Sequence, residues 1–436
     1  MSPEPLALEI NEIRKLMGGD ARLPSGTPST MVRGAFVDSR HPVEGALFVG
    51  IRGELDDGGR YAGDALRGGA AGVVVTESAW RWLEAEIGHL RKPVIVAKDP
   101  LAVLQAAGRL ALERSGARVA AITGAVGKTT TKDLLVAMLS TAGVRVHGSL
   151  GNRNTDVGVP LTLMDLPDDT QVAVIEMGMR GPGQIAELAA LAPPQVGCIT
   201  SIGPVHLELL GTIEAVAAAK AELIAALKPG TTAVVPDSEP LLADHIDALD
   251  PDVTVVRFGP QPDIELGLPP GSAWMMSNAS AALACCRALG YDLAPGTTVP
   301  VALSALRGAE SPLAGGGILI EDCYNANPLA MAAALRDLAQ RSGRRVAVLA
   351  DMKELGPDEV AYHAEVGRLA EELGIDLVVA VGALGAHYVN SEGVHFASVE
   401  ACIDGLAAHL QPGDTVLLKG SRSMALERVG ETLKVA

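Results

Sequence analysis

A phosphate-binding loop is the clearest chemical feature of this sequence. Residues 121–133 read Ala-Ile-Thr-Gly-Ala-Val-Gly-Lys-Thr-Thr-Thr-Lys-Asp; they end an apolar run and open a helical pattern. Glycines let such a loop turn its amide groups toward an anion, while lysine adds a positive charge and threonine a Mg²⁺ ligand. The match is the shorter Gly-x-x-Gly-Lys-Thr form, because position 122 is isoleucine. We expect a nucleoside triphosphate to bind at Gly124, Ala125, Val126, Gly127, Lys128, Thr129 and Thr130.

Three more side chains are candidates for this site, and each has a structural alternative. Glu176 follows the apolar run 172–175, so it should lie at the carboxyl edge of a sheet, where a Mg²⁺ ligand belongs. A solvated carboxylate at a strand end explains the same pattern. His206 follows a second apolar run, although a loop histidine is more often structural. Lys220 lies in a helical pattern and, taken alone, is an ordinary exposed lysine.

The composition indicates α/β domains and argues against nucleic acid as a partner. The chain has 436 residues, 48% hydrophobic but only 3% aromatic, which favours cores of Ala, Val, Leu and Ile in two to four domains. A net charge of -17 repels polyphosphate backbones. The five cysteines are scattered without CxxC spacing, so we expect reduced core residues. No targeting segment or membrane-spanning run is evident, and a cytoplasmic location is expected.

Alternating apolar runs and helical patterns predict three α/β domains. These are a small N-terminal domain (1–115), a central domain with a mostly parallel sheet (116–312) and a C-terminal Rossmann-like open sheet (313–436). The strand candidates are residues 47–51, 72–75, 94–97, 172–175, 196–199, 233–235, 318–320, 346–349, 377–380 and 416–418.

Motifs along nearly the whole chain resemble, in order, those of the Mur ligases, ATP-dependent amide-forming enzymes of peptidoglycan precursor synthesis. The matching segments include Asp38-Ser39-Arg40, Thr123 to Thr130, Gly151-Asn152-Arg153-Asn154, Glu176-Met177-Gly178, His206-Leu207-Glu208, Ala219-Lys220-Ala221-Glu222, Tyr324-Asn325-Ala326-Asn327-Pro328, Asp351-Met352-Lys353-Glu354-Leu355-Gly356 and Lys419-Gly420-Ser421-Arg422. The last three blocks resemble the branch that joins D-alanyl-D-alanine to UDP-N-acetylmuramoyl-tripeptide (UDP-MurNAc-tripeptide). The resemblance implies a UDP-substrate domain, an ATP-binding domain and an acceptor-binding domain.

The resemblance also implies a mechanism and residue roles. ATP would phosphorylate the peptide carboxylate, and the amine of the dipeptide would attack the acyl phosphate, giving ADP, phosphate and UDP-MurNAc-pentapeptide. Lys128, Glu176, His206 and Lys220 would be catalytic, and Thr129, Glu176, His206 and Lys220 would serve the Mg²⁺ sites, with Lys220 carbamylated by CO2. Nucleotide contacts would come from Asn278, Arg307, Asp322, Asn325 and Asn327, and substrate contacts from Asp38, Ser39, Arg40, Asn152 and Asn154. The chain is expected to act as a monomer on small-molecule substrates.

Several positions depart from the family pattern. Gly59 stands where the family has the histidine of Asp-Gly-His, and the block at 272–278 has Trp274 and lacks a histidine and an asparagine. Segment 259–271 is short, Arg307-Gly308 replaces Gly-Arg, and Ser201 replaces an asparagine. Two alternatives therefore stay open: a related ligase acting on another carboxylate and amine pair, and a nucleotide-binding regulatory protein without ligase activity.

Overall fold

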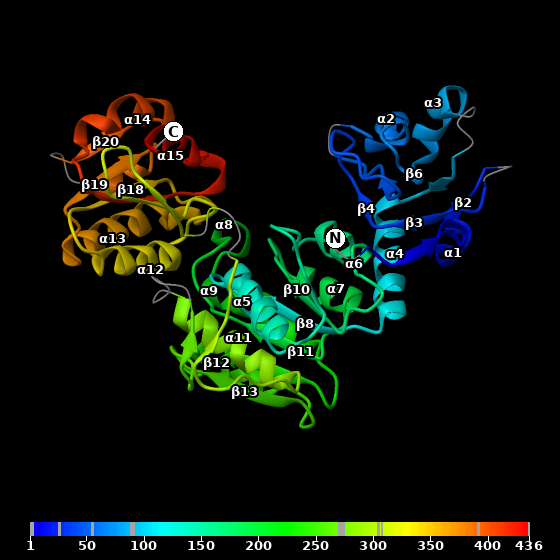
Figure 1. The fold of residues 1–436 in the computed structure, drawn as a ribbon, viewed down its shortest axis with the longest axis horizontal. Coiled ribbons are helices and arrows are strands. Elements are labelled where there is room, and N and C mark those ends of the chain that lie inside the picture. Colours follow the sequence, from blue (N-terminus) through cyan, green and yellow to red (C-terminus); the bar gives the residue numbers. More distant parts are fainter. Residues whose placement is uncertain are drawn as a thin grey trace.

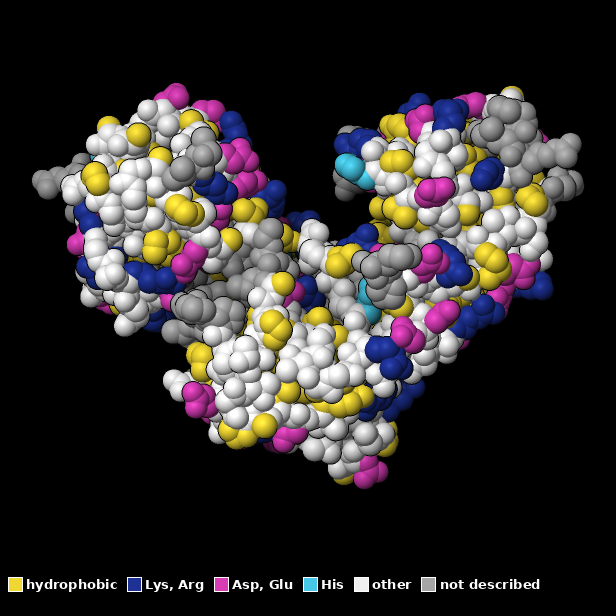
Figure 2. All heavy atoms as spheres, in the orientation of Figure 1, with side chains coloured by type: hydrophobic (Ala, Val, Ile, Leu, Met, Phe, Trp, Pro, Cys, Tyr) yellow, Lys and Arg dark blue, Asp and Glu magenta, His cyan; other side chains and the backbone are white. Residues whose placement is uncertain are grey.

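The computed structural model describes residues 4–24, 28–53, 56–87, 92–268, 275–302, 306, 308–389 and 393–434. Three α/β units form a V, with the central unit at its base and the N-terminal and C-terminal units as its arms (Figure 1). A hollow lies between the two arms in the space-filling view (Figure 2). The positions of Trp274 and Arg307 lie outside the described residues.

The N-terminal unit is a five-stranded sheet in the order β2-β7-β6-β5-β4, with only β2 antiparallel. Its strands are β2 (Ala21–Arg22), β4 (Ala35–Phe36), β5 (Leu47–Val49), β6 (Gly72–Val75) and β7 (Val94–Ala97), beside a separate pair, β1 (Ala7–Glu9) and β3 (Met31–Arg33). The helices are α1 (Ile10–Leu16), α2 (Ala62–Arg67), α3 (Glu77–Ile87) and α4 (Pro100–Ser115). Helix α4 is capped by Asp99, starts with proline and ends at Gly116 with φ 64°, as such sequence signals predict.

The central unit has a fully parallel six-stranded sheet in the order β13-β12-β11-β8-β10-β9. Its strands are β8 (Arg118–Thr123), β9 (Val146–Gly148), β10 (Val172–Glu176), β11 (Val196–Ile199), β12 (Thr232–Pro236) and β13 (Thr254–Phe258). The helices are α5 (Lys128–Thr141), α6 (Gly158–Met164), α7 (Gln184–Leu191), α8 (Leu207–Leu210), α9 (Ile213–Ala225), α10 (Ala243–Asp247) and α11 (Met276–Ala288). Helices α5 and α11 share one core with the sheet, and α7 and α9 share another. Because both faces are covered, strands such as β8 and β10 are almost continuously apolar.

Segment 259–268 contributes one short strand, β14 (Leu266–Gly267), which pairs with β15 (Thr297–Thr298). In the described residues, this small additional sheet therefore consists of two two-residue strands.

The C-terminal unit has the sheet order β16-β17-β21-β18-β19-β20, with only β16 antiparallel. Its strands are β16 (Ala309–Pro312), β17 (Ile318–Glu321), β18 (Arg345–Ala350), β19 (Leu377–Val381), β20 (Val394–Phe396) and β21 (Thr415–Lys419). Its helices are α12 (Pro328–Ala339), α13 (Glu359–Glu372), α14 (Val399–Gly405) and α15 (Glu427–Leu433). Helices α12 and α13 share one core with the sheet, and α14 and α15 share another. Strand β16 precedes residue 313, where we expected this domain to begin, yet it belongs to the C-terminal sheet.

Two expectations from composition can be compared with this fold. All five cysteines are buried and free, which confirms their assignment as core residues. Across the described ranges, the helices are too short or too polar to cross a lipid bilayer.

Candidate active site

The phosphate-binding loop joins β8 to α5 and is held by the end of the neighbouring strand, β11. The amides of Ala125 and Val126 donate to the backbone oxygen and the Oγ of Ser201, both at 2.9 Å. Gly127 has φ 87°, and a Cβ at this position would lie 2.1 Å from Oδ1 of Asn278. A Cβ at Gly124 would lie 1.9 Å from Oγ1 of Thr200. The loop therefore requires glycine at both positions, as its motif predicts.

Two lysines converge on one carbonyl group of the loop. Nζ of Lys128 donates to the oxygen of Gly124 at 2.7 Å, and Nζ of Lys220 donates to the same oxygen at 3.0 Å. Lys220 is only 2% exposed, which corrects the alternative of an exposed helix lysine. Burial, together with the nearby positive charge of Lys128, holds the pKa of Lys220 well below its ordinary value. Lys220 thus carries an amine that loses its proton unusually easily.

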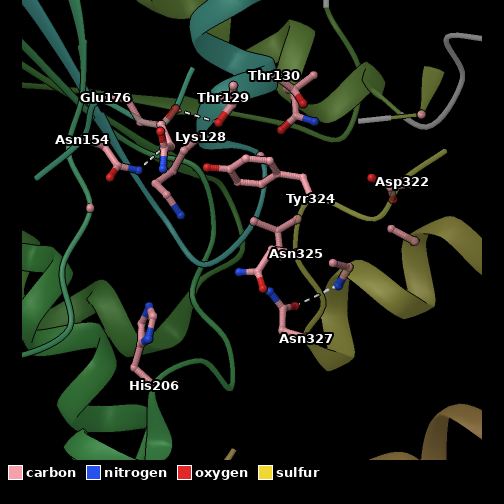
Figure 3. Close-up of a pocket in the computed structure, with 18 of the residues that line it drawn as sticks. Lys128, Thr129, Thr130, Asn154, Glu176, His206, Asp322, Tyr324, Asn325 and Asn327 are labelled. Carbon is pink, nitrogen blue, oxygen red and sulfur yellow. Dashed lines mark hydrogen bonds between the residues drawn. The ribbon is translucent and has the colours of Figure 1, made fainter. Parts of the chain in front are cut away.

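Glu176 ends β10 and is buried beneath the loop at 1% exposure, so it is not a solvated strand-end carboxylate. Its Oε2 accepts from Oγ1 of Thr129 at 2.6 Å, and its Oε1 accepts from Nδ2 of Asn154 at 2.8 Å (Figure 3). The amide of Glu176 donates to Oγ of Ser149 at 3.1 Å. The tertiary structure therefore fixes both oxygens of this carboxylate, and Asn154 contributes by orienting it.

The Thr129 and Glu176 pair fits a magnesium ion, because Mg²⁺ prefers oxygen ligands and usually completes its shell with water and phosphate. The described residues contain no cluster of three or more His, Cys, Asp or Glu side chains able to hold a metal ion alone. Lys220 offers a nitrogen that is already donating, so it would supply oxygen only as a carbamate. An ion here would therefore depend on Thr129, Glu176 and ligand oxygens.

His206 lies apart from this oxygen pair, at the start of α8 in the central unit (Figure 3). It precedes α8 with φ 54°, and its Nδ1 lies 2.6 Å from Oε2 of Glu354. Burial lowers the pKa of His206, and the neighbouring Glu354 carboxylate opposes this effect. The bond to Glu354 leaves Nε2 as the ring nitrogen for a ligand.

The C-terminal unit faces the phosphate-binding loop across a cavity and forms its opposite wall. Oδ2 of Asp322 accepts from Nζ of the buried Lys419 at 2.5 Å. Asn327 caps α12 by accepting from the amide of Ala330 at 2.9 Å, so this predicted ligand residue also has a structural role. Tyr324 extends from this wall toward Lys128 and the phosphate-binding loop (Figure 3).

A cavity of about 550 Å³ separates the two walls and gathers most of the predicted residues. Those lining it are Val126, Gly127, Lys128, Thr129, Thr130, Asn152, Asn154, Glu176, His206, Lys220, Asn278, Asp322, Asn325 and Asn327. Gly124 and Ala125 belong to the loop but do not line the cavity. Oδ1 of Asn278 accepts from Oγ1 of Thr131 at 3.3 Å, which ties α11 to the start of α5.

The predicted substrate residues Asp38, Ser39 and Arg40 are not brought to this cavity. They follow β4 in the N-terminal arm (Figure 1). Nε and Nη2 of Arg40 bind the two carboxylate oxygens of Asp38 at 2.8 and 2.7 Å, and these hydrogen bonds hold the pKa of Asp38 well below its usual range. Asp38 and Ser39 are half-buried, Arg40 is exposed, and all three lie on a different domain.

Sequence reasoning missed several residues of the cavity. Asp337 and Arg341 lie one helical turn apart at the end of α12 and are paired at 3.0 Å, and Arg341 also binds Glu310 at 2.8 Å. Their spacing of four would have placed them on one helix face, but nothing in the sequence shows that this face borders a cavity. Lys419 belonged to a quoted motif without being assigned to the site, and Arg180 and Tyr324 were also missed.

Comparison with known proteins places this site in a family. The Mur ligase middle domain matches residues 122–268, and the Mur ligase, glutamate ligase domain matches residues 311–422. UDP-N-acetylmuramoyl-tripeptide--D-alanyl-D-alanine ligase of Bacillus subtilis is 32% identical, over 97% of this chain and 98% of the relative. A crystal structure of MurF from Acinetobacter baumannii superimposes with a TM-score of 0.82 at 27% identity, covering 98% of both chains. MurF from Thermotoga maritima in complex with ADP gives 0.77 at 26% identity, covering 92% of this chain and 97% of that one.

These similarities extend over all three domains, including the N-terminal arm that neither domain match covers. The chain belongs to the Mur ligase family, and within that family it groups with MurF.

Proposed function

We propose that this chain joins D-alanyl-D-alanine to UDP-MurNAc-tripeptide at the expense of ATP, releasing ADP and phosphate. One observation carries the proposal: a phosphate-binding loop with a buried carboxylate faces the Asp322 to Asn327 segment of another domain across one cavity. A ligase of this kind must hold ATP on one side and admit an amine from the other. The relatives that match nearly the full chain bear the name of this activity.

The first step activates an unreactive carboxylate. An oxygen of the tripeptide carboxylate attacks the γ-phosphorus of ATP, the bond to the β-phosphate oxygen breaks, and ADP leaves. Lys128 would exchange its bond to the oxygen of Gly124 for the phosphates, and the loop amides at the start of α5 would orient them. When bound, Mg²⁺ held by Thr129 and Glu176 would neutralise charge on the phosphate oxygens.

The second step forms the amide. The free amine of D-alanyl-D-alanine attacks the acyl carbon, phosphate leaves with the former carboxylate oxygen, and the amine loses a proton. The acyl phosphate is prone to hydrolysis, so the site must exclude water while the amine arrives. Placement of the cavity between two domains supports a closing movement that would do this.

Closure is also needed for the first substrate, because Asp38 and Arg40 lie in the other arm of the V. Small-angle scattering should show compaction when a nonhydrolysable ATP analogue and UDP-MurNAc-tripeptide are both present. Unchanged dimensions would contradict this part of the proposal. The same measurement gives the molecular mass, for which we expect that of a monomer.

Lys220 is proposed to react with CO2. Its lowered pKa and burial favour an unprotonated nitrogen, which attacks the carbon of CO2 and loses a proton to give a carbamate. The carbamate would turn a donor into two oxygen acceptors beside the loop. A carbonyl signal from bound ¹³CO2 in the wild type, absent in Lys220→Ala, would support this reaction. Equal signals in both proteins would contradict it.

A second candidate, a MurF-like ligase for another carboxylate and amine pair, is favoured by the departure at Gly59. Here a Cβ would lie 2.6 Å from Cβ of Ala79 and 3.0 Å from Oδ1 of Asp57. The histidine of the family pattern therefore has no room in this arrangement. The N-terminal domain would bind its UDP-linked substrate differently or bind a different one.

One experiment separates these candidates. Phosphate release from ATP is measured with UDP-MurNAc-tripeptide, with and without D-alanyl-D-alanine, and the product is analysed by mass. UDP-MurNAc-pentapeptide formed only in the complete mixture would support the main proposal. The reaction would take place in the cytoplasm, where ATP is supplied. Absence of product with intact ATP binding would favour the second candidate.

A further inference from the structure

Glu354 makes a contact between domains that the proposed reaction does not explain. It lies in the turn between β18 and α13 and is one of four described non-glycine residues with positive φ, at 64°. Its Oε2 lies 2.6 Å from Nδ1 of His206, and its Oε1 accepts from Nη2 of Arg180 at 2.8 Å. Its backbone oxygen accepts from the amide of Glu208 at 3.4 Å.

The partners of Glu354 belong to two loops of the ATP-binding sheet. Arg180 lies four residues after Glu176 in the loop that follows β10, and His206 lies in the loop that follows β11. Both residues line the cavity. A single carboxylate of the C-terminal unit therefore contacts two loops at the carboxyl edge of the central sheet.

The backbone around Glu354 fits this contact closely. Gly356 has φ 72°, and a Cβ at this position would lie 3.4 Å from the amide nitrogen of Glu208. The side chains of His206 and Glu354 are 25% and 33% exposed, so the pair is partly shielded from water. A left-handed conformation is unfavourable for glutamate and persists where the surrounding structure imposes it.

We propose that Glu354 is a positioning residue that docks the C-terminal unit onto the loops carrying Arg180 and His206. Its bond to Nδ1 fixes the orientation of the His206 ring and leaves Nε2 for a ligand in the cavity, as carboxylates commonly do for ligand histidines. The proposal rests on the proposed function, because it gives this docking a catalytic purpose. The acceptor-carrying domain would thereby hold in place the two loops after β10 and β11 that border the cavity.

The test uses the full chain with Glu354→Gln, Arg180→Gln and the double variant. Glu365→Gln is the matched control, since Glu365 is exposed on α13 of the same domain and loses the same charge. The first measurement is hydrogen exchange of residues 205–211 without substrates, which includes the Glu208 amide. The second is kcat and KM for ATP, with thermal unfolding of every variant to verify folding.

Glu354→Gln should raise exchange at 205–211 about tenfold and lower kcat about tenfold, in the range of ordinary coupling between sites. The KM for ATP should stay unchanged, because Glu354 does not contact the phosphate-binding loop. The double variant should be no slower than Glu354→Gln alone, because each substitution breaks the same contact between Arg180 and Glu354.

Exchange or kcat of Glu354→Gln equal to that of Glu365→Gln would overturn the proposal. Exchange does not depend on substrate identity. If the wild type made no pentapeptide, the proposed function would fail while exchange still showed whether Glu354 docks the two units.

Discussion

The central and N-terminal units each hold a predicted site carboxylate, but the surroundings of the two carboxylates differ. Glu176 is buried, and its oxygens are held by Thr129 and Asn154, which come from separate segments of the central unit. The side chain of Asp38 is 39% exposed, and its partners Arg40 and His41 lie two and three residues away in sequence. The surroundings of Glu176 are therefore fixed by the fold without a ligand, whereas those of Asp38 are local and open to salt.

The largest effect should come from removing the charge of Lys128. Lys128→Met should lower kcat about 100- to 1000-fold, because a fixed positive charge no longer stabilises the transferring phosphoryl group. Thermal unfolding should change little. Steady-state phosphate release in the complete mixture measures the effect, with Glu365→Gln as control. A fall in kcat of less than tenfold would contradict a catalytic role for Lys128.

Substituting Gly127 should come next. Gly127→Ala introduces a methyl group 2.1 Å from Oδ1 of Asn278 at φ 87°, so the loop must shift and ATP affinity should fall about tenfold or more. Gly143→Ala is the matched control, since Gly143 follows the same helix with φ 79° and has open space around its Cβ position. The control should lose only about 1 kcal/mol of stability from backbone strain.

Calorimetric titration with a nonhydrolysable ATP analogue distinguishes these two glycine variants. Equal affinities would show that the loop tolerates a side chain at residue 127 and is less rigidly organised than we infer.

At the open end the effect should appear in KM. Asp38→Asn should raise KM for UDP-MurNAc-tripeptide about fivefold, with kcat nearly unchanged and no shift in thermal unfolding, because this exposed pair adds little to stability. Raising the salt concentration should likewise raise the KM of the wild type for UDP-MurNAc-tripeptide. A fall in kcat without a change in KM would give Asp38 a role in the chemistry.

The smallest effect concerns the stability of the buried lysine. The folded-state pKa of Lys220 lies below its ordinary value of 10.5, so between these two values the unfolded chain binds more protons. Stability of the wild type should therefore rise with pH in this window, and Lys220→Met should lack this contribution. Thermal unfolding in CO2-free buffer from about pH 7 to about pH 10 measures the difference. A difference in unfolding temperature between wild type and Lys220→Met that stays constant across this pH range would contradict the lowered pKa.

The sequence predicted the parts of this molecule that depend on neighbouring residues. The phosphate-binding loop and the strand ending at Glu176 follow from glycine spacing and apolar runs, and both are present as expected. Short edge strands such as β9 and β20 were missed, because three half-buried residues give little periodic signal.

Contacts across domains could not be predicted from the chain. Asp337 and Arg341 reach the cavity only through the packing of α12, and Glu354 reaches His206 only because two domains meet. The depth of Lys220 was also hidden, since its helix packs on both sides and gives no clear polar face.

The acyl phosphate intermediate can be tested by following one oxygen atom through the reaction. UDP-MurNAc-tripeptide labelled with ¹⁸O in the reacting carboxylate is incubated with ATP, Mg²⁺ and D-alanyl-D-alanine, and the released phosphate is analysed by mass spectrometry. We expect one ¹⁸O atom in the phosphate for each amide formed, because the carboxylate oxygen leaves with the phosphoryl group. Phosphate without the label, released while pentapeptide accumulates, would contradict the acyl phosphate.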